Sequence, residues 1–279
     1  MTDAAILRLA AFTDDPRGGN PAGVVIGPTL PDPAEMQRIA ADVGYSETAF
    51  LAGDGGSRWT TRYWSPAAEV PFCGHATIAS AIALHDRFGV GAVELETTVG
   101  TVPVSIEQQD GGVLATLTSV EPSVANLADD DLALLLGHLG WGRLQLDPEL
   151  PPRVGFAGAH HPVIAVRDRA ILASLSYDFD GLRALMEDRD WTTIQIVWRA
   201  SPTVFHARDP FPVGGVVEDP ATGAAAAAFG AYLRALRLVD VPATVTIHQG
   251  EDLGRPSLIG VAIPATGGIR VSGAAVPIA

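Results

Sequence analysis

Apolar residues recur in short runs that glycine, proline and asparagine separate, which is the pattern of short strands joined by turns. In the first half of the chain these runs cover residues 5–11, 22–26, 48–51, 59–64, 93–97, 102–106 and 113–117. In the second half they cover residues 153–156, 163–166, 193–198 and 204–207, and three further strands close the chain. Because the strands come in runs instead of alternating with helices, the pattern favours an α+β fold over a parallel βαβ sheet.

Helical patterns of two kinds interrupt the strands. Asp32 at an N-cap, Pro33 at the first helical position and apolar residues at helical spacing predict an amphipathic helix that ends at Gly44. Residues 77–84 and about 222–236 are instead apolar nearly all round, and the second of these stretches contains an alanine run that permits close packing. Each half of the chain is therefore predicted to enclose one buried helix among its strands.

One phrase occurs twice in the sequence. Residues 69–76 read EVPFCGHA and residues 218–225 read EDPATGAA, with Glu, Pro, Gly and Ala in the same columns and a helical stretch after each copy. A weaker echo, at a slightly different offset, relates residues 20–25 to residues 161–166. The sequence thus predicts a duplicated strand–loop–helix element. Because a helix start presents unpaired N–H groups and partial positive charge, each copy would suit an anionic small molecule.

We place a domain boundary near Glu121–Pro122, where the run of strands gives way to a helical pattern over residues 129–139. The predicted N-terminal domain covers residues 1–120, with its central helix near 74–86. The predicted C-terminal domain covers residues 121–279, with its central helix near 222–236, and the last strand could cross back to the first domain.

Composition excludes several classes of function. The 279 residues are 47% hydrophobic and 18% charged, which is enough apolar material for packed cores. The formal net charge of −14 argues against a nucleic-acid partner.

Every basic residue is arginine, which excludes both a P-loop lysine and a Schiff-base lysine for pyridoxal phosphate. A single cysteine excludes an intrachain disulfide. The first residues lack the basic region and apolar stretch of a signal peptide, and no apolar stretch reaches the roughly 18 residues of a membrane span. We therefore expect a cytoplasmic protein without a membrane partner.

Three residues of the first half could carry chemistry. Glu47 stands between a helix end and an apolar strand, where a desolvated carboxylate would suit proton transfer near neutral pH, although a solvated residue at a strand start fits the pattern as well. His75 follows Gly74 at the start of the buried helix, where a neutral imidazole could bind a substrate oxygen, relay a proton or simply bond a backbone carbonyl. Cys73 is either a thiol activated by the same helix start or a small core residue.

The second half offers Asp219, which precedes a proline. That placement is ordinary turn chemistry, but duplicated loops are expected to face one cleft, where Asp219 would oppose Glu47. The histidines lack metal-binding spacing, and neither a nucleophile-elbow motif nor a dinucleotide-binding motif occurs. Metal chemistry therefore has little support, and acid–base chemistry without a cofactor remains.

Four motifs together resemble the phenazine-biosynthesis PhzF-like proteins, and they occur in family order. They are Phe12 with residues 19–25, residues 46–50, residues 71–77 and residues 218–223. The resemblance implies a diaminopimelate-epimerase-like fold, in which two pseudo-symmetric domains each wrap a curved, mostly antiparallel sheet around a central helix and the active site lies in the cleft between them. It also implies a homodimeric isomerase without metal or cofactor, whose phenazine-forming member acts on a dihydro-hydroxyanthranilate.

The resemblance also assigns roles to residues. The family's catalytic glutamate falls on Glu47, its active-site Gly-His on Gly74 and His75, and its second-domain aspartate on Asp219. Backbone N–H groups at Gly74 and Gly223 are expected to hold a substrate carboxylate or developing negative charge, with Cys73 beside them.

One position departs from the pattern. The phenazine enzyme has a serine where this chain has Ala224, so a hydroxyl expected near the substrate is missing. The related epimerases use two cysteines in equivalent loops, whereas Cys73 has only Thr222 in the matching column. The leading hypothesis is a proton-shifting isomerase of a small carboxylate with Glu47 as general base and acid. The alternatives are a non-catalytic small-anion-binding protein of the same fold and a Cys73-dependent epimerase.

Overall fold

The computed structural model describes residues 5–109 and 112–278, and these form two compact units. The first unit comprises residues up to Thr118 together with a C-terminal segment that begins at Ser272, and the second comprises Ser119–Val271. Residues 1–4 and 279 lie outside the described residues. The predicted outer ends of the two domains fall there, as does the N-terminal segment considered for a leader. Within the described part of the chain, every helix falls short of the length and hydrophobicity that crossing a bilayer requires.

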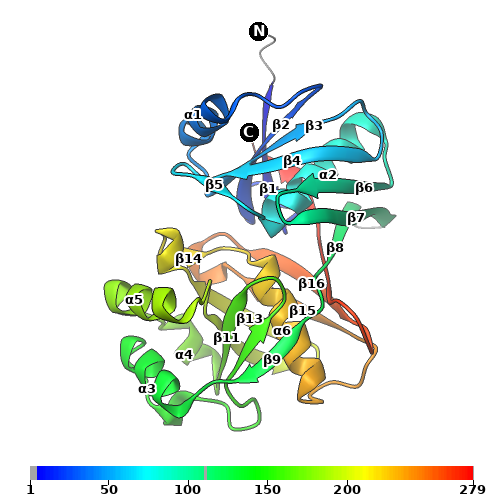
Figure 1. Ribbon diagram of the computed structural model, residues 1–279. Coiled ribbons are helices and arrows are strands. Elements are labelled where there is room, and N and C mark those ends of the chain that lie inside the picture. Colours follow the sequence, from blue (N-terminus) through cyan, green and yellow to red (C-terminus); the bar gives the residue numbers. More distant parts are fainter. Residues whose placement is uncertain (1–4, 110–111, 279) are drawn as a thin grey trace. The chain divides into compact units, whose positions relative to one another are not determined.

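The first unit is one mixed sheet. Its strands run in the order β18-β1-β2-β3-β4-β6-β7-β8, with β5 paired to β4, and all neighbours are antiparallel except β2–β3 and β4–β6. The bounds are β1 Ile6–Ala11, β2 Asn20–Gly27, β3 Glu47–Ala52, β4 Arg58–Trp64, β5 Glu69–Val70, β6 Ala92–Thr97, β7 Gly100–Gln109, β8 Gly112–Thr118 and β18 Ala275–Pro277. The two helices that pack on this sheet are α1 Pro33–Val43 and α2 Gly74–Phe88 (Figure 1).

Helix α1 begins and ends where the sequence predicts. Asp32 accepts a hydrogen bond on its side chain from the Glu35 N–H, and Gly44 ends the helix with a left-handed φ of 72° while its N–H bonds the Ala40 carbonyl. The buried face of α1 packs on one face of the sheet through Met36 and Ala40.

Helix α2 is the central helix of the first unit, and all its residues from His75 to Leu84 are buried. It packs against β1, β2, β3, β7, β8 and β18, on the other side of the sheet from α1 (Figure 1). Its first turn is held by Thr77, whose Oγ1 donates to the Cys73 carbonyl at 2.7 Å and lies 2.7 Å from the hydroxyl of Tyr63. The prediction of a helix buried nearly all round is confirmed here.

The second unit has the same plan. Its strands run in the order β9-β10-β11-β12-β13-β15-β16, with β14 paired to β13, and parallel pairing occurs at β11–β12 and β13–β15. The bounds are β9 Ser123–Asn126, β10 Arg153–Phe156, β11 His160–Val166, β12 Gln195–Ser201, β13 Val204–Pro210, β14 Glu218–Asp219, β15 Ala243–Gln249 and β16 Ser257–Ile263. Strand β17, Arg270–Gly273, lies where the chain passes back to the first unit.

Helices cover both faces of the second sheet. One face holds the central helix α6, Gly223–Ala235, and the other holds α3 Asp129–His138, α4 Arg169–Ala173 and α5 Phe179–Arg189, which share an apolar core with β11 and β12 (Figure 1). Short 3₁₀ turns occur at Arg143–Gln145, Pro212–Gly214 and Glu251–Leu253. The alanine run of α6 lets the sheet approach closely: a Cβ added at Gly155 of β10 would lie 2.9 Å from the Ala228 carbonyl oxygen.

The two sheets repeat one sequence of pairings. From β1 to β7 and from β10 to β16 the pairs are antiparallel, parallel, antiparallel, parallel and antiparallel in the same order. The short strands β5 and β14, which carry the start of the repeated phrase, precede the central helices in both units. The weaker sequence echo falls on β2 and β11, which occupy equivalent places in the two sheets.

Candidate active site

Glu47 is the first residue of β3, a strand whose following residues Thr48–Leu51 are buried. Its side chain is 15% exposed, so the carboxylate is largely but not wholly removed from solvent. The Glu47 Oε2 atom lies 3.3 Å from Nε2 of His75. The start of β3 and the start of α2 therefore bring together two of the predicted site residues.

The hydrogen bonds around His75 determine which ring nitrogen carries the proton. Nδ2 of Asn20 lies 3.1 Å from His75 Nδ1, and because an amide NH₂ group only donates, Nδ1 accepts. In the neutral ring the proton is then on Nε2, which faces the Glu47 carboxylate and lies 3.4 Å from the Ser46 hydroxyl. His75 thus presents an N–H donor to the carboxylate of Glu47.

Cys73 completes the cluster as the N-cap residue of α2. Its Sγ lies 3.4 Å from Nδ1 and 3.7 Å from Nε2 of His75. Donor atoms of Glu47, Cys73 and His75 all lie within 4.8 Å of one another, so these side chains could also hold a soft divalent cation such as zinc. The next residue, Gly74, is the first of the helix, where the backbone N–H has no intrahelical acceptor.

The second unit holds Asp219 at the end of β14, just before the start of α6. Thr222, the N-cap of α6, donates from Oγ1 to Oδ2 of Asp219 at 2.7 Å. Gln249 from the end of β15 supports both residues, because its Nε2 donates to the Asp219 carbonyl at 2.8 Å and to Thr222 Oγ1 at 3.1 Å. Asp219 is thereby fixed beside Gly223, the first residue of α6.

Three residues of these clusters were given no role in the sequence analysis. Asn20 lies between Gly19 and Pro21 in the first of the four motifs. A polar side chain beside the proline of an apolar strand is the only feature of the local sequence that indicates a role for it. Ser46 immediately precedes Glu47. Gln249 ends an ordinary strand, and its function depends on contacts that only the folded chain creates.

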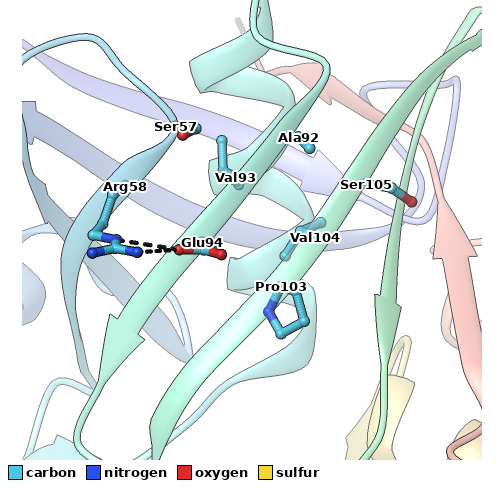
Figure 2. Close-up of a pocket in the computed structure, with 8 residues that line it drawn as sticks. All are labelled: Ser57, Arg58, Ala92, Val93, Glu94, Pro103, Val104 and Ser105. Atoms are coloured by element: carbon cyan, nitrogen blue, oxygen red, sulfur yellow. Dashed lines mark hydrogen bonds and ion pairs between the residues drawn. The ribbon is translucent and has the colours of Figure 1, made fainter.

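A surface hollow of about 680 Å³ occurs elsewhere in the first unit. Figure 2 shows that it lies over β6 and β7 beside the Arg58–Glu94 ion pair, in which Nη2 and Oε2 are 2.8 Å apart. Its lining residues are Ser57, Arg58, Ala92, Val93, Glu94, Pro103, Val104 and Ser105. None of them belongs to the Glu47 cluster, and an exposed ion pair on strand surfaces offers no proton-transfer geometry. Of these two places, the Glu47 cluster is therefore the candidate active site.

Comparison with known proteins gives consistent matches along the chain. The model of the phenazine biosynthesis-like protein family (PhzC-PhzF) matches residues 9–279. A trans-2,3-dihydro-3-hydroxyanthranilate isomerase from Pseudomonas fluorescens is 32% identical, over 89% of this chain and 86% of the relative. The crystal structure of a Bacillus anthracis phenazine biosynthesis protein of the PhzF family superposes with a TM-score of 0.87 at 25% identity, covering 100% of this chain and 98% of that one.

A more distant structure has the same fold. A hydroxyproline epimerase from Agrobacterium vitis superposes with a TM-score of 0.67 at 14% identity, covering 98% of this chain and 90% of that one. These matches confirm the family resemblance carried by the four motifs. They also confirm the predicted α+β, diaminopimelate-epimerase-like fold, and they favour an enzyme over a non-catalytic anion-binding protein.

Proposed function

The chain belongs to the family of phenazine biosynthesis-like proteins and is an isomerase, and we propose that it moves a proton between two carbon atoms of a small carboxylate without a cofactor. The observation that carries this proposal is the contact between Glu47 Oε2 and His75 Nε2 at 3.3 Å, with Nδ1 of the same ring held by Asn20. A carboxylate and a neutral imidazole in this arrangement are an acceptor and a donor of protons that need no metal to act.

Glu47 is the general base and acid of the proposed reaction. Its carboxylate takes a proton from a carbon that a neighbouring carbonyl or double bond makes acidic, and the electron pair spreads into that unsaturation. The same carboxyl group, which is partly exposed and exchanges its proton with solvent, then protonates a different carbon, so the product is an isomer and no electrons are gained or lost. His75 donates its Nε2–H toward the carboxylate or a substrate oxygen and keeps Glu47 in position.

The helix starts supply the proposed binding groups for the substrate anion. Backbone N–H groups at Gly74 and Gly223 stand at the positive ends of α2 and α6, where a carboxylate or developing negative charge is stabilised. We propose that Cys73 contacts the substrate and that Asp219 assists the same reaction. Asp219 is buried with only 8% of its surface exposed, which suits a group whose orientation matters.

The substrate of two relatives is the first compound to test. Curated relatives from two Pseudomonas species, 32% and 31% identical, are named trans-2,3-dihydro-3-hydroxyanthranilate isomerases. Ala224 stands in this chain where the resemblance leads us to expect a serine, so we propose that the preferred substrate lacks the group which that hydroxyl would bind.

The substitution Glu47→Gln tests the proposal. It keeps the size of the side chain and removes the basic oxygen, so we expect the rate of isomerisation to fall roughly 10²–10⁴-fold, the usual contribution of a positioned proton-transfer group. The matched control is Glu107→Gln, which makes the same change at an exposed position of β7 and should leave the rate unchanged. Full activity in Glu47→Gln on a substrate that the wild type isomerises would refute the assignment.

A second candidate function rests on the thiol. Cys73 Sγ lies 3.4 Å from His75 Nδ1. If the thiol replaced Asn20 as the partner of Nδ1, the ring would accept the thiol proton and create a nucleophilic or basic thiolate. A Cys73-dependent epimerase predicts that Cys73→Ala abolishes turnover while Glu47→Gln does not. The isomerase centred on Glu47 predicts the reverse order of effects, so the pair of variants separates the two functions.

A further inference from the structure

The Glu47 cluster also has the composition of a metal site. Glu47, Cys73 and His75 offer a carboxylate oxygen, a thiol sulfur and an imidazole nitrogen, and one such atom from each lies within 4.8 Å of the others. Three protein ligands of these kinds, with a fourth position left open to water or a small anion, are the usual basis of a reactive zinc site. The start of β3 and the start of α2 supply all three side chains.

The distances within the cluster are close to those between the ligands of tetrahedral zinc. Bonds of about 2.3 Å to sulfur and about 2.1 Å to nitrogen and oxygen place sulfur about 3.6 Å from nitrogen, and nitrogen about 3.4 Å from oxygen. Cys73 Sγ lies 3.7 Å from His75 Nε2, and Glu47 Oε2 lies 3.3 Å from the same nitrogen. Two of the three edges of the ligand triangle are therefore already formed.

The donor set selects the kind of cation. A thiolate and an imidazole favour zinc and cobalt, whereas magnesium and calcium require six or more oxygen ligands. Cys73 and His75 are buried, which protects the bonds that they would make, and the partly exposed Glu47 carboxylate leaves one side of the cluster open to solvent. We expect zinc, cobalt and cadmium to bind and magnesium and calcium not to bind.

Asn20 opposes this use of the ring. Its Nδ2 donates to His75 Nδ1 at 3.1 Å, so the proton of the neutral ring is on Nε2, the nitrogen that a cation between Cys73 and Glu47 needs. Metal binding at Nε2 therefore requires the ring proton to move to Nδ1 and the Asn20 amide to turn its oxygen toward it. Because Asn20 is buried, the amide nitrogen cannot replace its bond to the ring with a bond to water. This cost lowers the affinity of the cluster for metal.

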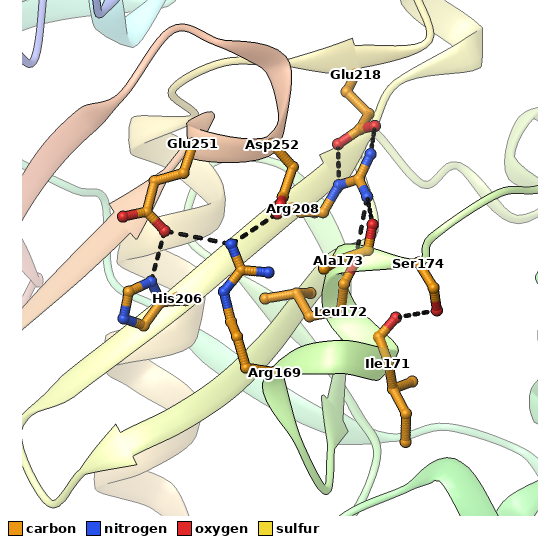
Figure 3. A network of polar contacts seen from close by, with 10 residues as sticks. All are labelled: Arg169, Ile171, Leu172, Ala173, Ser174, His206, Arg208, Glu218, Glu251 and Asp252. Atoms are coloured by element: carbon orange, nitrogen blue, oxygen red, sulfur yellow. Dashed lines mark hydrogen bonds and ion pairs between the residues drawn. The ribbon is translucent and has the colours of Figure 1, made fainter.

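A second cluster of histidine and carboxylate side chains contains an arginine instead. In the second unit, His206 Nδ1 lies 2.6 Å from Glu251 Oε2, and Arg169 Nη2 lies 3.5 Å from the same oxygen and 2.9 Å from Asp252 Oδ2 (Figure 3). A guanidinium between two carboxylates occupies their lone pairs and repels a cation. His206 thus provides a matched control for His75.

We infer that Glu47, Cys73 and His75 form an inhibitory binding site for zinc and similar thiophilic cations, and that Asn20 keeps its affinity low. On binding, the Cys73 thiol loses its proton to solvent, Glu47 binds as the carboxylate and the ring proton moves from Nε2 to Nδ1, so one proton is released for each cation. The inhibition rests on the proposed function, because a cation on Glu47 and His75 takes the general base out of use.

Cobalt(II) is the probe for the site, because a thiolate ligand gives it a charge-transfer absorption band and Cys73 is the only cysteine. The full chain, freed of metal with a chelator, would be titrated with cobalt chloride. We expect the band to appear and saturate, to disappear when zinc is added and to persist in excess magnesium. Cys73→Ser should lack the band and His75→Gln should bind cobalt more weakly, whereas His206→Gln should match the wild type.

Two substitutions test the role of Asn20. The carboxylate of Asn20→Asp accepts from Nδ1–H and leaves Nε2 to the cation, so we expect cobalt affinity to rise about 10–100-fold. Asn20→Ala removes the donor without adding charge and should also raise the affinity. Asn126→Asp, at an exposed position of β9, should leave it unchanged. Equal affinities of the wild type, Asn20→Asp and Asn20→Ala would contradict the role of Asn20.

Turnover gives the last measurement. On a known substrate, zinc should inhibit the wild type and a chelator should restore its activity, and full activity with zinc bound would contradict inhibition. Absence of the cobalt band from both the wild type and Asn20→Asp would overturn the inference and leave the test of Glu47→Gln unaffected. Full activity in metal-free Glu47→Gln would instead remove the proposed function, while the cobalt band of the wild type would remain.

Discussion

At the scale of single residues, the candidate site depends on the side chains that determine which ring nitrogen of His75 carries the proton. Asn20 is 2% exposed and His75 is 6% exposed, so their contact at 3.1 Å is protected from exchange with water. Because Asn20 donates to Nδ1, the ring keeps its proton on the side of Glu47. Replacing the partners that orient metal-bound histidines commonly alters metal affinity or activity by about 10–100-fold, and we expect an effect of that order for Asn20.

The substitution Asn20→Asp tests this role. A carboxylate accepts from Nδ1–H, so Nδ1 should gain a proton, and Nε2 should no longer be the one protonated nitrogen of the ring. We expect a loss of activity of about 10–100-fold, together with a change of the ¹⁵N chemical shift of His75 Nδ1 from that of a bare ring nitrogen to that of a protonated one. Asn126→Asp, at an exposed position of β9, is the matched control. Unchanged ¹⁵N shifts in Asn20→Asp would show that Asn20 does not set the tautomer.

The sequence identifies the members of the Glu47 cluster better than the polar residues that contact them. Glu47, His75, Cys73 and Gly74 were identified from motifs, and the structure places all four at one end of α2 and β3. Asn20 and Gln249 are polar residues at strand ends, and nothing in their local sequence distinguishes them from solvated ones.

At the scale of elements, the central helices are shaped by close approach of the strands around them. Gly230 of α6 is the clearest case, since a Cβ there would lie 2.8 Å from Ile269 Cγ2 and 2.9 Å from Val261 Cγ1. These are side chains of a packed core, which can move only by displacing their own neighbours. The small residues of α6 therefore determine how closely the sheet wraps the helix.

Gly230→Ala should accordingly destabilise the protein by about 1–3 kcal/mol through overpacking, although alanine is the better helix former. The control is Gly137→Ala in α3, where an added Cβ has no neighbour within 4 Å, and this change should stabilise by about 0.4–1 kcal/mol. Urea unfolding of both variants measures the difference. If both variants gained stability equally, the packing account of α6 would be wrong.

Strong periodic patterns predicted elements well, and weak ones did not. Helix α1 has a cap, a proline and a terminal glycine, and both of its ends were predicted correctly. Strand β9 has the sequence SVAN and was not predicted, because its four mostly exposed residues are held by pairing with β10 and not by an apolar pattern. The short strands β5 and β14 also depend on their partners, and only the repeated phrase indicated them.

At the scale of the whole molecule, the two units share one fold but do not carry the same candidate catalytic residues. Both units have the same order of parallel and antiparallel pairs, and both begin their central helix after the same motif. Yet Gln195, which pairs with β11 at the start of β12 as Glu47 pairs with β2 at the start of β3, is the counterpart of Glu47, and His75 has Ala224 in the matching column. Duplication of the fold was visible in the sequence, whereas the correspondence of Glu47 with Gln195 requires the strand register. We expect proton transfer to be asymmetric, with Glu47 as its centre.

The most direct test of that claim is the incorporation of solvent deuterium. Wild-type protein would be incubated in D₂O with trans-2,3-dihydro-3-hydroxyanthranilate, the substrate named for its relatives, or with a substrate found by screening, and the product analysed by mass spectrometry and NMR. We predict that the wild type introduces deuterium at the newly protonated carbon and that Glu47→Gln does so at least about 100-fold more slowly. Deuterium incorporation by Glu47→Gln at the wild-type rate would contradict the account.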